Sequence, residues 1–245
     1  MKHANTLGIA VALALLAASA NVSAALIVAA PTGSSVVDFS QFNSEWSFGV
    51  GAGPVAVGGL VGESITWQSS FSSSVVGNGY YGLAGNGSWT PLRDGYVGLN
   101  SGDPSDYMDF VFDNGPVASV AGFINYSTLF EPAFVEIFGD VGQLLESIDL
   151  TAVAEISTPG ESVAGGFRGF SRASNDIYTF RVRGAYAVLD DLSFLRSSAS
   201  VATPGELSLF AMGLFGLVFF HRRQAALTIP MAQPPARQHP PGDIR

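Results

Sequence analysis

Carboxylates are the main acid or base groups that the central part of this 245-residue chain offers for enzyme chemistry. The chain has no cysteine, and its only histidines lie near the two ends, at His3, His221 and His239. The central part therefore lacks the residues for a histidine-assisted nucleophile or a histidine zinc site. No Gly-x-x-x-x-Gly-Lys phosphate loop occurs either. These absences predict a protein that is not an enzyme.

Four acidic residues leave one hydrolytic alternative open. A glycoside hydrolase needs two carboxyl groups placed ~5 to 9.5 Å apart around the scissile bond. The candidates are Glu131, Glu136, Asp140 and Glu146. Glu136 alternates with bulky apolar neighbours, as an outward-facing strand residue does, so solvated strand and turn acids are the simpler interpretation.

Three aspartates predict a structural calcium site. Asp190 and Asp191 lie in LDDLSF near the end of the folded region, and Asp38 lies in the expected first strand. The first and last strands of jelly-roll sandwiches are often neighbours, which would bring these oxygens together. Calcium takes six to eight oxygen ligands and would link the two ends of a cysteine-free domain. In the alternative interpretation, Asp190 faces solvent and Asp191 caps a bend or protects an edge strand.

Aromatic residues in a glycine-rich stretch are the best candidates for ligand recognition. The stretch 77–89, GNGYYGLAGNGSW, contains Tyr80, Tyr81 and Trp89. Aromatic rings stack on the apolar faces of sugars, and asparagine side chains can bond sugar hydroxyls. The sequence therefore predicts a glycan-stacking surface here, although rings at sheet ends also close hydrophobic cores.

The charge balance argues against a nucleic-acid partner. The formal net charge is −9, and between residues 25 and 200 acidic residues outnumber arginines about three to one. Phosphate backbones require clustered lysine and arginine, which this region lacks. The acidity is compatible with solubility after export or with cation binding.

Alternating apolar and polar residues predict antiparallel strands between residues 35 and 197. The run 106–113, DYMDFVFD, places Met108, Phe110 and Phe112 on one face and a more polar set on the other. Similar runs lie at 64–71, 133–140 and 176–184. Helical patterns are scarce, so the predicted fold is all-β: an antiparallel two-sheet β-sandwich of jelly-roll type. A signal helix and a short apolar helix are expected to flank it.

The N-terminus has the pattern of a secretory signal peptide. Lys2 precedes an apolar run from Leu7 to Ala20, and small residues follow at Val22, Ser23 and Ala24. A charged start, a short apolar stretch and a small-residue exit are what signal peptidase recognises. The predicted signal is residues 1–24, cut after Ala24, with residues 25–34 as a linker.

A second short apolar segment lies near the C-terminus. Residues 207–220 are apolar except for Ser208, and His221, Arg222 and Arg223 follow. About fourteen helical residues reach ~21 Å, less than the ~30 Å hydrocarbon core of a bilayer. The arginine pair would stay on the cytoplasmic side. The segment therefore predicts transient membrane insertion rather than a durable anchor.

Residues 198–223 resemble the PEP-CTERM sorting domain of exported bacterial proteins. The resemblance rests on the box VATPGEL (201–207), the glycine-spaced apolar run, and the pair Arg222 and Arg223. In that family an exosortase processes the box and releases or attaches the protein at the cell surface. The resemblance implies an exosortase-like partner acting at the box, with Pro204 its retained proline.

Two features depart from the family pattern. Ala202 and Thr203 stand where the family has Pro and Glu, and the chain continues beyond the arginines through a Pro-rich tail, 224–245. That composition predicts disorder. A short anchor retained in the inner membrane is the competing outcome.

The central region resembles the jelly-roll passenger domain of PEP-CTERM proteins, similar in outline to carbohydrate-binding sandwich modules. The resemblance lies in the order of four stretches, 116–126, 134–150, 165–171 and 185–194. It implies a fold and a location in the cell envelope, at the cell surface or outside the cell. The predicted function is a non-enzymatic exported protein that associates with extracellular polysaccharide or matrix, the alternative being a carboxylate-dependent glycoside hydrolase.

Overall fold

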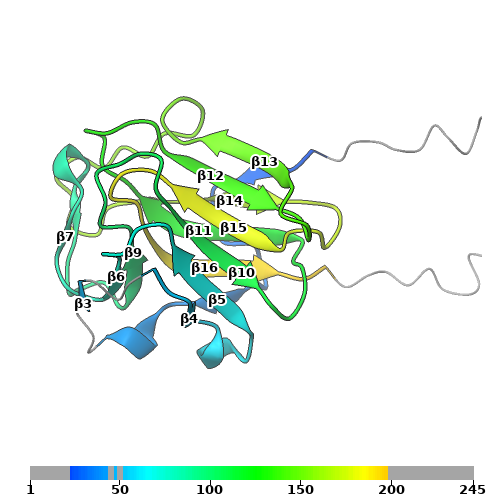
Figure 1. The fold of residues 1–245 in the computed structure, drawn as a ribbon. Helices are drawn as coiled ribbons and strands as arrows, with labels where there is room; N and C mark the ends of the chain where they lie inside the picture. The colour runs from blue at the N-terminus through cyan, green and yellow to red at the C-terminus, as the bar shows by residue number, and fades with distance from the viewer. Residues whose placement is uncertain (1–22, 44–46, 49–51, 198–245) are drawn as a thin grey trace, which may run out of the picture. The chain divides into compact units, whose positions relative to one another are not determined.

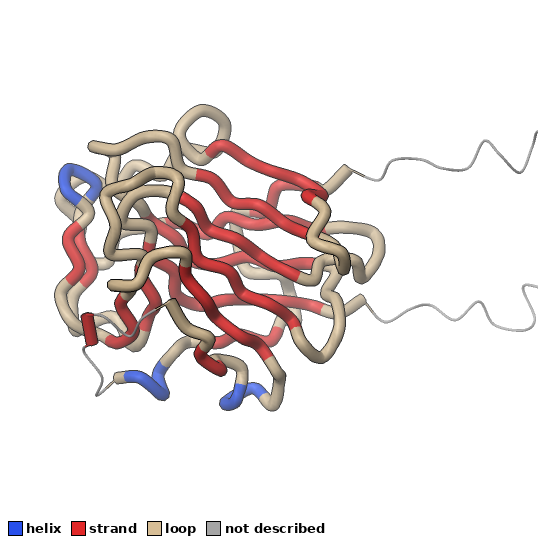
Figure 2. Tube along the Cα trace, viewed as in Figure 1, coloured by secondary structure: helices blue, strands red, loops and turns tan. Residues whose placement is uncertain are grey.

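Antiparallel strands make up nearly all the regular structure of the chain (Figure 1). The computed structural model describes residues 23–43, 47–48 and 52–197. These residues form sixteen strands and three short 3-10 helices, shown in red and blue in Figure 2. The helices are η1 (Ser40–Phe42), η2 (Gly59–Val61) and η3 (Ala84–Asn86). No helix among the described residues has the length and hydrophobicity to cross a membrane.

The larger sheet has eight strands. Seven follow one another in the order β1 (Ala25–Ile27), β14 (Gly166–Ser171), β11 (Ser119–Asn125), β16 (Val188–Leu195), β9 (Tyr96–Gly98), β6 (Val75–Gly77) and β3 (Ser47–Phe48). The eighth, β2 (Ser35–Val37), pairs antiparallel with β16, so that Val37 lies opposite Leu192. The first predicted strand and the last are therefore neighbours, as expected.

The smaller sheet has six strands and faces the larger one. Its order is β13 (Leu144–Asp149), β12 (Phe134–Phe138), β15 (Thr179–Arg183), β10 (Tyr107–Phe112), β5 (Ile65–Ser69) and β4 (Val55–Ala56). The strand runs predicted from alternation, 64–71, 106–113, 133–140 and 176–184, contain β5, β10, β12 and β15. All pairings between these strands are antiparallel.

The main hydrophobic core lies between the two sheets. In β10 the side chains of Met108, Phe110 and Phe112 are buried, as the alternation predicts, and Phe112 packs against Phe194 of the larger sheet with ring centroids 5.4 Å apart. Trp67 of β5 is also fully buried. Each large apolar side chain buried in this way contributes about 2 kcal/mol, so the sandwich-like pairing of the sheets accounts for most of the stability.

A smaller second core covers part of the outer face of the larger sheet. The hairpin of β7 (Tyr81–Gly82) and β8 (Ser88–Trp89) packs Tyr81, Leu83 and Trp89 against Tyr96 and Val188 of that sheet. Trp89 and Tyr96 meet edge to face with their centroids 5.1 Å apart. The hairpin is therefore fixed in place, and the loops at its end are positioned by packing.

The folded body begins earlier than residue 35. β1 lies inside the stretch 25–34 predicted as a linker, and it pairs with β14 through Ala25 and Ser171. Ala24, the expected last residue of the signal peptide, is half-buried and donates its backbone N–H to Glu146 Oε1 at 2.9 Å. Alternation cannot reveal a three-residue edge strand, because so short a run shows no period.

Several predicted features lie outside the described residues. They are the signal segment before residue 23, both flanking helices, the sorting segment 198–223 with Pro204, Arg222 and Arg223, and the tail 224–245.

Candidate functional site

Three loops meet at one end of the sheets and enclose a hollow with a volume of about 250 Å³. One is the turn within the β7–β8 hairpin, the second follows β11, and the third joins β15 to β16. The lining residues are Gly82, Ala84, Ser127, Leu129, Phe130 and Tyr186. We call this site the aromatic hollow.

Large apolar side chains stand exposed around the aromatic hollow. Leu129 is 70% exposed and Phe130 is 42% exposed. Phe130 and Tyr186 lie with ring centroids 6.0 Å apart, at an angle of 47°. Tyr80, 63% exposed, stands beside Gly82, where an added Cβ would lie 3.5 Å from its ring. Exposed rings gathered at one place make this surface a candidate binding site.

A buried polar network holds two of these loops together. The Asn86 side chain donates to Asn125 Oδ1 at 2.6 Å, and the Asn125 side chain donates to the Asn86 carbonyl at 3.0 Å. Thr158 donates its backbone N–H to Asn86 Oδ1 at 2.9 Å. Asn86 follows Ala84 in η3, and Asn125 ends β11 just before Ser127. The network therefore fixes both sides of the aromatic hollow.

Two lining residues have a strained backbone. Ala84 has φ of 53° and Tyr186 has φ of 50°, in the left-handed region that non-glycine residues rarely adopt. Each such residue costs roughly 1 kcal/mol or more, and such strain clusters at binding sites. Tyr186 is held there by its backbone N–H, which donates to Ser101 O at 2.7 Å. The backbone geometry thus fixes the direction in which the Tyr186 side chain projects from the backbone.

The lining of the aromatic hollow contains no charged side chain. It offers aromatic and aliphatic surface together with hydroxyl and backbone groups, which suits an uncharged ligand with an apolar face. None of the four candidate catalytic carboxylates lines it. Glu136 instead pairs with Arg183 at 3.2 Å, and Glu146 pairs with Arg172 at 3.4 Å.

The predicted glycan-stacking trio is divided by the structure. Tyr80 is exposed, but Tyr81 and Trp89 are buried in the second core, so their faces cannot stack on a ligand. Tyr81 donates its hydroxyl to Leu99 O at 2.9 Å, and Trp89 donates Nε1–H to Ala164 O. Burial raises the pKa of Tyr81 well above its usual value. The correction is that only Tyr80 of the three belongs to a candidate binding surface.

An arginine lies between the two adjacent aspartates predicted to bind calcium. Arg93 Nε lies 2.8 Å from Asp190 Oδ2, and Nη2 lies 3.1 Å from Asp191 Oδ2. The Nε contact is an ion pair without hydrogen-bond geometry, so its attraction is purely electrostatic. The guanidinium also stacks over the rings of Phe123 and Trp89, at 3.9 and 4.8 Å from their centroids.

The third predicted calcium ligand has a local partner. Asp38 is exposed and accepts hydrogen bonds from Ser40, from the backbone N–H at 3.1 Å and the hydroxyl at 2.8 Å. Across the described ranges, no group of three or more acidic or histidine side chains has an arrangement that could hold a metal ion. The strand pairing predicted for this region is present, with Arg93 supplying the positive charge beside Asp190 and Asp191.

The buried carboxyl of Asp190 is expected to make stability depend on pH. Burial raises the pKa of Asp190 to about 8, although the Arg93 guanidinium opposes this shift. A carboxyl with a higher pKa in the folded state binds a proton on folding. Its contribution to stability is fully present below about pH 4 and is lost as the pH rises toward 8. We expect the free energy of unfolding to fall by about 1 kcal/mol per pH unit between pH 5 and 8.

Urea unfolding at pH 5, 6, 7 and 8 measures this dependence. Asp190→Asn should flatten the decline, whereas Asp140→Asn, on an exposed turn, should retain it. A wild-type decline that persists in Asp190→Asn would show that another group is responsible.

Comparison of the chain with known protein families and with curated proteins finds no match. The candidate site therefore rests on its own geometry. Sequence reasoning missed Leu129, Phe130 and Tyr186. One signal was available for the first two, since LF stands between Thr128 and the Glu131–Pro132 pair, outside any alternating run.

Proposed function

We propose that this chain is an exported, non-enzymatic protein whose jelly-roll-like sandwich binds extracellular polysaccharide through the aromatic hollow. The observation that carries the proposal is the group of exposed rings around an uncharged hollow at one end of the sheets. Rings of this kind stack on the apolar faces of sugars, while nearby hydroxyl and backbone groups bond their hydroxyls.

The proposal of export rests on the sequence. The N-terminal pattern is that of a secretory signal, and the segment 198–223 resembles a PEP-CTERM sorting domain processed by an exosortase. Location at the cell surface or outside the cell would place the aromatic hollow among polysaccharides.

Retention of the purified chain in polysaccharide gels tests the proposed function. Native electrophoresis through gels that contain mixed-linkage β-glucan, dextran or galactomannan should show slower migration in at least one of them. Phe130→Ala and Tyr80→Ala should each weaken that retention about tenfold, the effect of losing one stacking contact of about 1.4 kcal/mol. Because both side chains are exposed, the melting temperature should stay within about 1 °C.

Leu92→Ala is the matched control, because Leu92 is 84% exposed and does not line the aromatic hollow. Its retention should equal that of the unmodified chain. Retention that survives both ring substitutions would place binding elsewhere, and migration unaffected by every polymer would refute the proposed function.

A further inference from the structure

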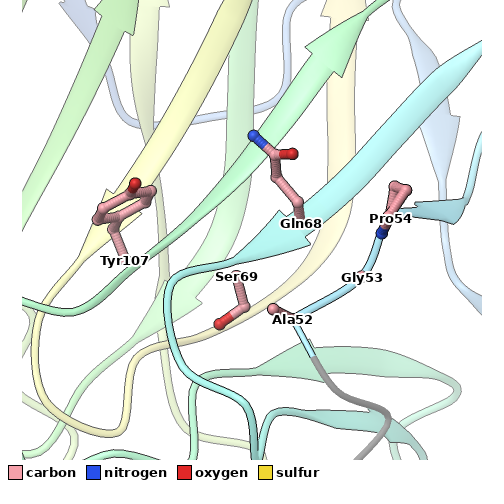
Figure 3. Close-up of a pocket in the computed structure, with 6 residues that line it drawn as sticks. All are labelled: Ala52, Gly53, Pro54, Gln68, Ser69 and Tyr107. Atoms are coloured by element: carbon pink, nitrogen blue, oxygen red, sulfur yellow. The ribbon is translucent and has the colours of Figure 1, made fainter.

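A second hollow lies at the edge of the smaller sheet, where β5 ends and β10 begins (Figure 3). It has a volume of about 310 Å³ and is lined by Ala52, Gly53, Pro54, Gln68, Ser69 and Tyr107. We call it the polar hollow. In Figure 3 the Tyr107 ring and the Gln68 amide extend to the same side of the sheet, while Ser69 points the other way. The polar hollow thus presents one ring and one amide together.

The ring and the amide are held in place by neighbouring side chains on the same face of the sheet. The Arg181 guanidinium lies 3.6 Å from the centroid of the Tyr107 ring and forms two hydrogen bonds with Asp109, at 2.7 and 3.0 Å. The exposed Gln68 side chain makes a single long hydrogen bond, 3.5 Å to Asp109 Oδ2, within the part of the chain that the structure describes. Its amide therefore has donor and acceptor capacity left for a ligand.

A short loop connects the polar hollow with the aromatic hollow. Asp106 accepts hydrogen bonds from Ser70 at 2.7 Å and from Ser101 at 2.6 Å, and its carbonyl accepts the Gly184 N–H at 3.1 Å. Ser101 in turn accepts the backbone N–H of Tyr186. The loop that ends in Tyr107 is thus bonded directly to the loop that carries Tyr186.

The two hollows are close enough for one polymer to reach both. Tyr107 lies opposite Arg183 in the sheet, a cross-strand separation of about 5 Å, and Tyr186 is three residues farther along the chain. Three extended residues span at most about 10 Å, so the separation is no more than about 15 Å.

We infer that the aromatic hollow and the polar hollow are two subsites of one surface, which binds an extended segment of an uncharged polysaccharide. The inference rests on the proposed function and deepens it. The lining of both hollows lacks charged side chains, and the loop between them carries Asp103 and Asp106, which repel an anionic chain. The aromatic hollow holds a sugar face, and the Gln68 amide bonds hydroxyls farther along the chain.

Dependence on ligand length tests the inference. For the polymer that retains the chain, affinities are measured by calorimetry for its disaccharide and hexasaccharide fragments. Gln68→Ala and Tyr107→Phe should each weaken hexasaccharide binding about fivefold and leave disaccharide binding unchanged. Phe130→Ala should weaken both. Alginate, an anionic polymer, should not retain the chain. Thr66→Ala is the control, since Thr66 lies on the same face of β5 but outside the polar hollow.

The outcomes separate the inference from the proposed function. Hexasaccharide affinity that Gln68→Ala and Tyr107→Phe leave unchanged, or retention by alginate equal to that of the neutral polymer, overturns the inference alone. Failure of every polymer to retain the chain overturns the proposed function and the inference together.

Discussion

Arg93→Met is expected to destabilise the protein by about 2–3 kcal/mol at pH 10, two units above the pKa of about 8 that Asp190 has beside Arg93. The substitution keeps an apolar side chain against the rings of Trp89 and Phe123 but leaves the Asp190 carboxylate, 3% exposed, without its counter-ion. An unpaired buried charge is costly, and it can avoid the cost only by taking up a proton. Because Asp190 is largely protonated at pH 5, the loss should be clearly smaller there than at pH 10.

Arg196→Met is the matched control for this prediction. Arg196 pairs with Glu63 at 2.6 Å, but its side chain is 30% exposed, so loss of the pair should cost at most about 1 kcal/mol. Urea unfolding of both variants at the two pH values gives the comparison. Equal losses in the two variants, or a loss from Arg93→Met that does not change with pH, would contradict the role assigned to Arg93.

Asn86→Ala is expected to cost at least about 3 kcal/mol. The substitution removes the side chain that bonds Asn125, donates to the Tyr126 and Ile156 carbonyls at 3.2 and 3.1 Å, and accepts the Thr158 N–H. Each buried group that loses its only partner costs roughly 1–3 kcal/mol. Because the network fixes both sides of the aromatic hollow, retention by polysaccharide should also weaken.

Chemical unfolding and gel retention of the same variant check both parts of this prediction. Asn114→Ala is the control, since Asn114 makes one exposed hydrogen bond of 3.3 Å to Glu63 and should change neither property. A stable Asn86→Ala protein would mean that water replaces the lost partners. A destabilised variant with full retention would mean that the hollow does not depend on the network.

The all-β character of the fold was predictable because four of the longer strands, β5, β10, β12 and β15, lie in runs of alternating apolar and polar residues. The period of two in 106–113 identifies both the strand β10 and its buried face. The pairing of β2 with β16 was also expected, which placed Asp38 in the same region as Asp190 and Asp191. These features follow from local pattern and from a common topology, so they can be read from the sequence alone.

Arg93, the partner of Asp190 and Asp191, could not be predicted from local sequence patterns. Arg93 is 98 residues from Asp191 in the chain, and it stands in a turn-like stretch beside Asp94 and Gly95. Only the pairing of β9 with β16 and the packing of the hairpin on the larger sheet bring it there. Local patterns in a single sequence do not show which residues far apart in the chain come into contact.

The aromatic residues show the same limit at shorter range. Tyr80 and Tyr81 are adjacent and chemically identical, yet one is 63% exposed and the other 3%. Their difference arises because Tyr81 belongs to a two-residue strand packed on the second core, too short to give an alternation signal. Phe130 could not be recognised from the sequence, because single exposed apolar residues are common on protein surfaces. Such a residue indicates a site only when other rings lie close to it in the fold.

The two ends of the folded body lie at one end of the sheets, and the aromatic hollow lies at the other end. Ala25, Ser171, Ser119 and Leu195 form one row across the larger sheet, whereas Tyr186 precedes the other end of β16 (Figure 1). The eight residues of β16 separate the two ends by about 26 Å. In the proposed function, an attachment beyond Ser197 and a polymer bound in the hollow would together pull along β16. The hydrogen bonds that join β16 to its neighbours would then be loaded in shear, several of them together, so the larger sheet would resist that pull.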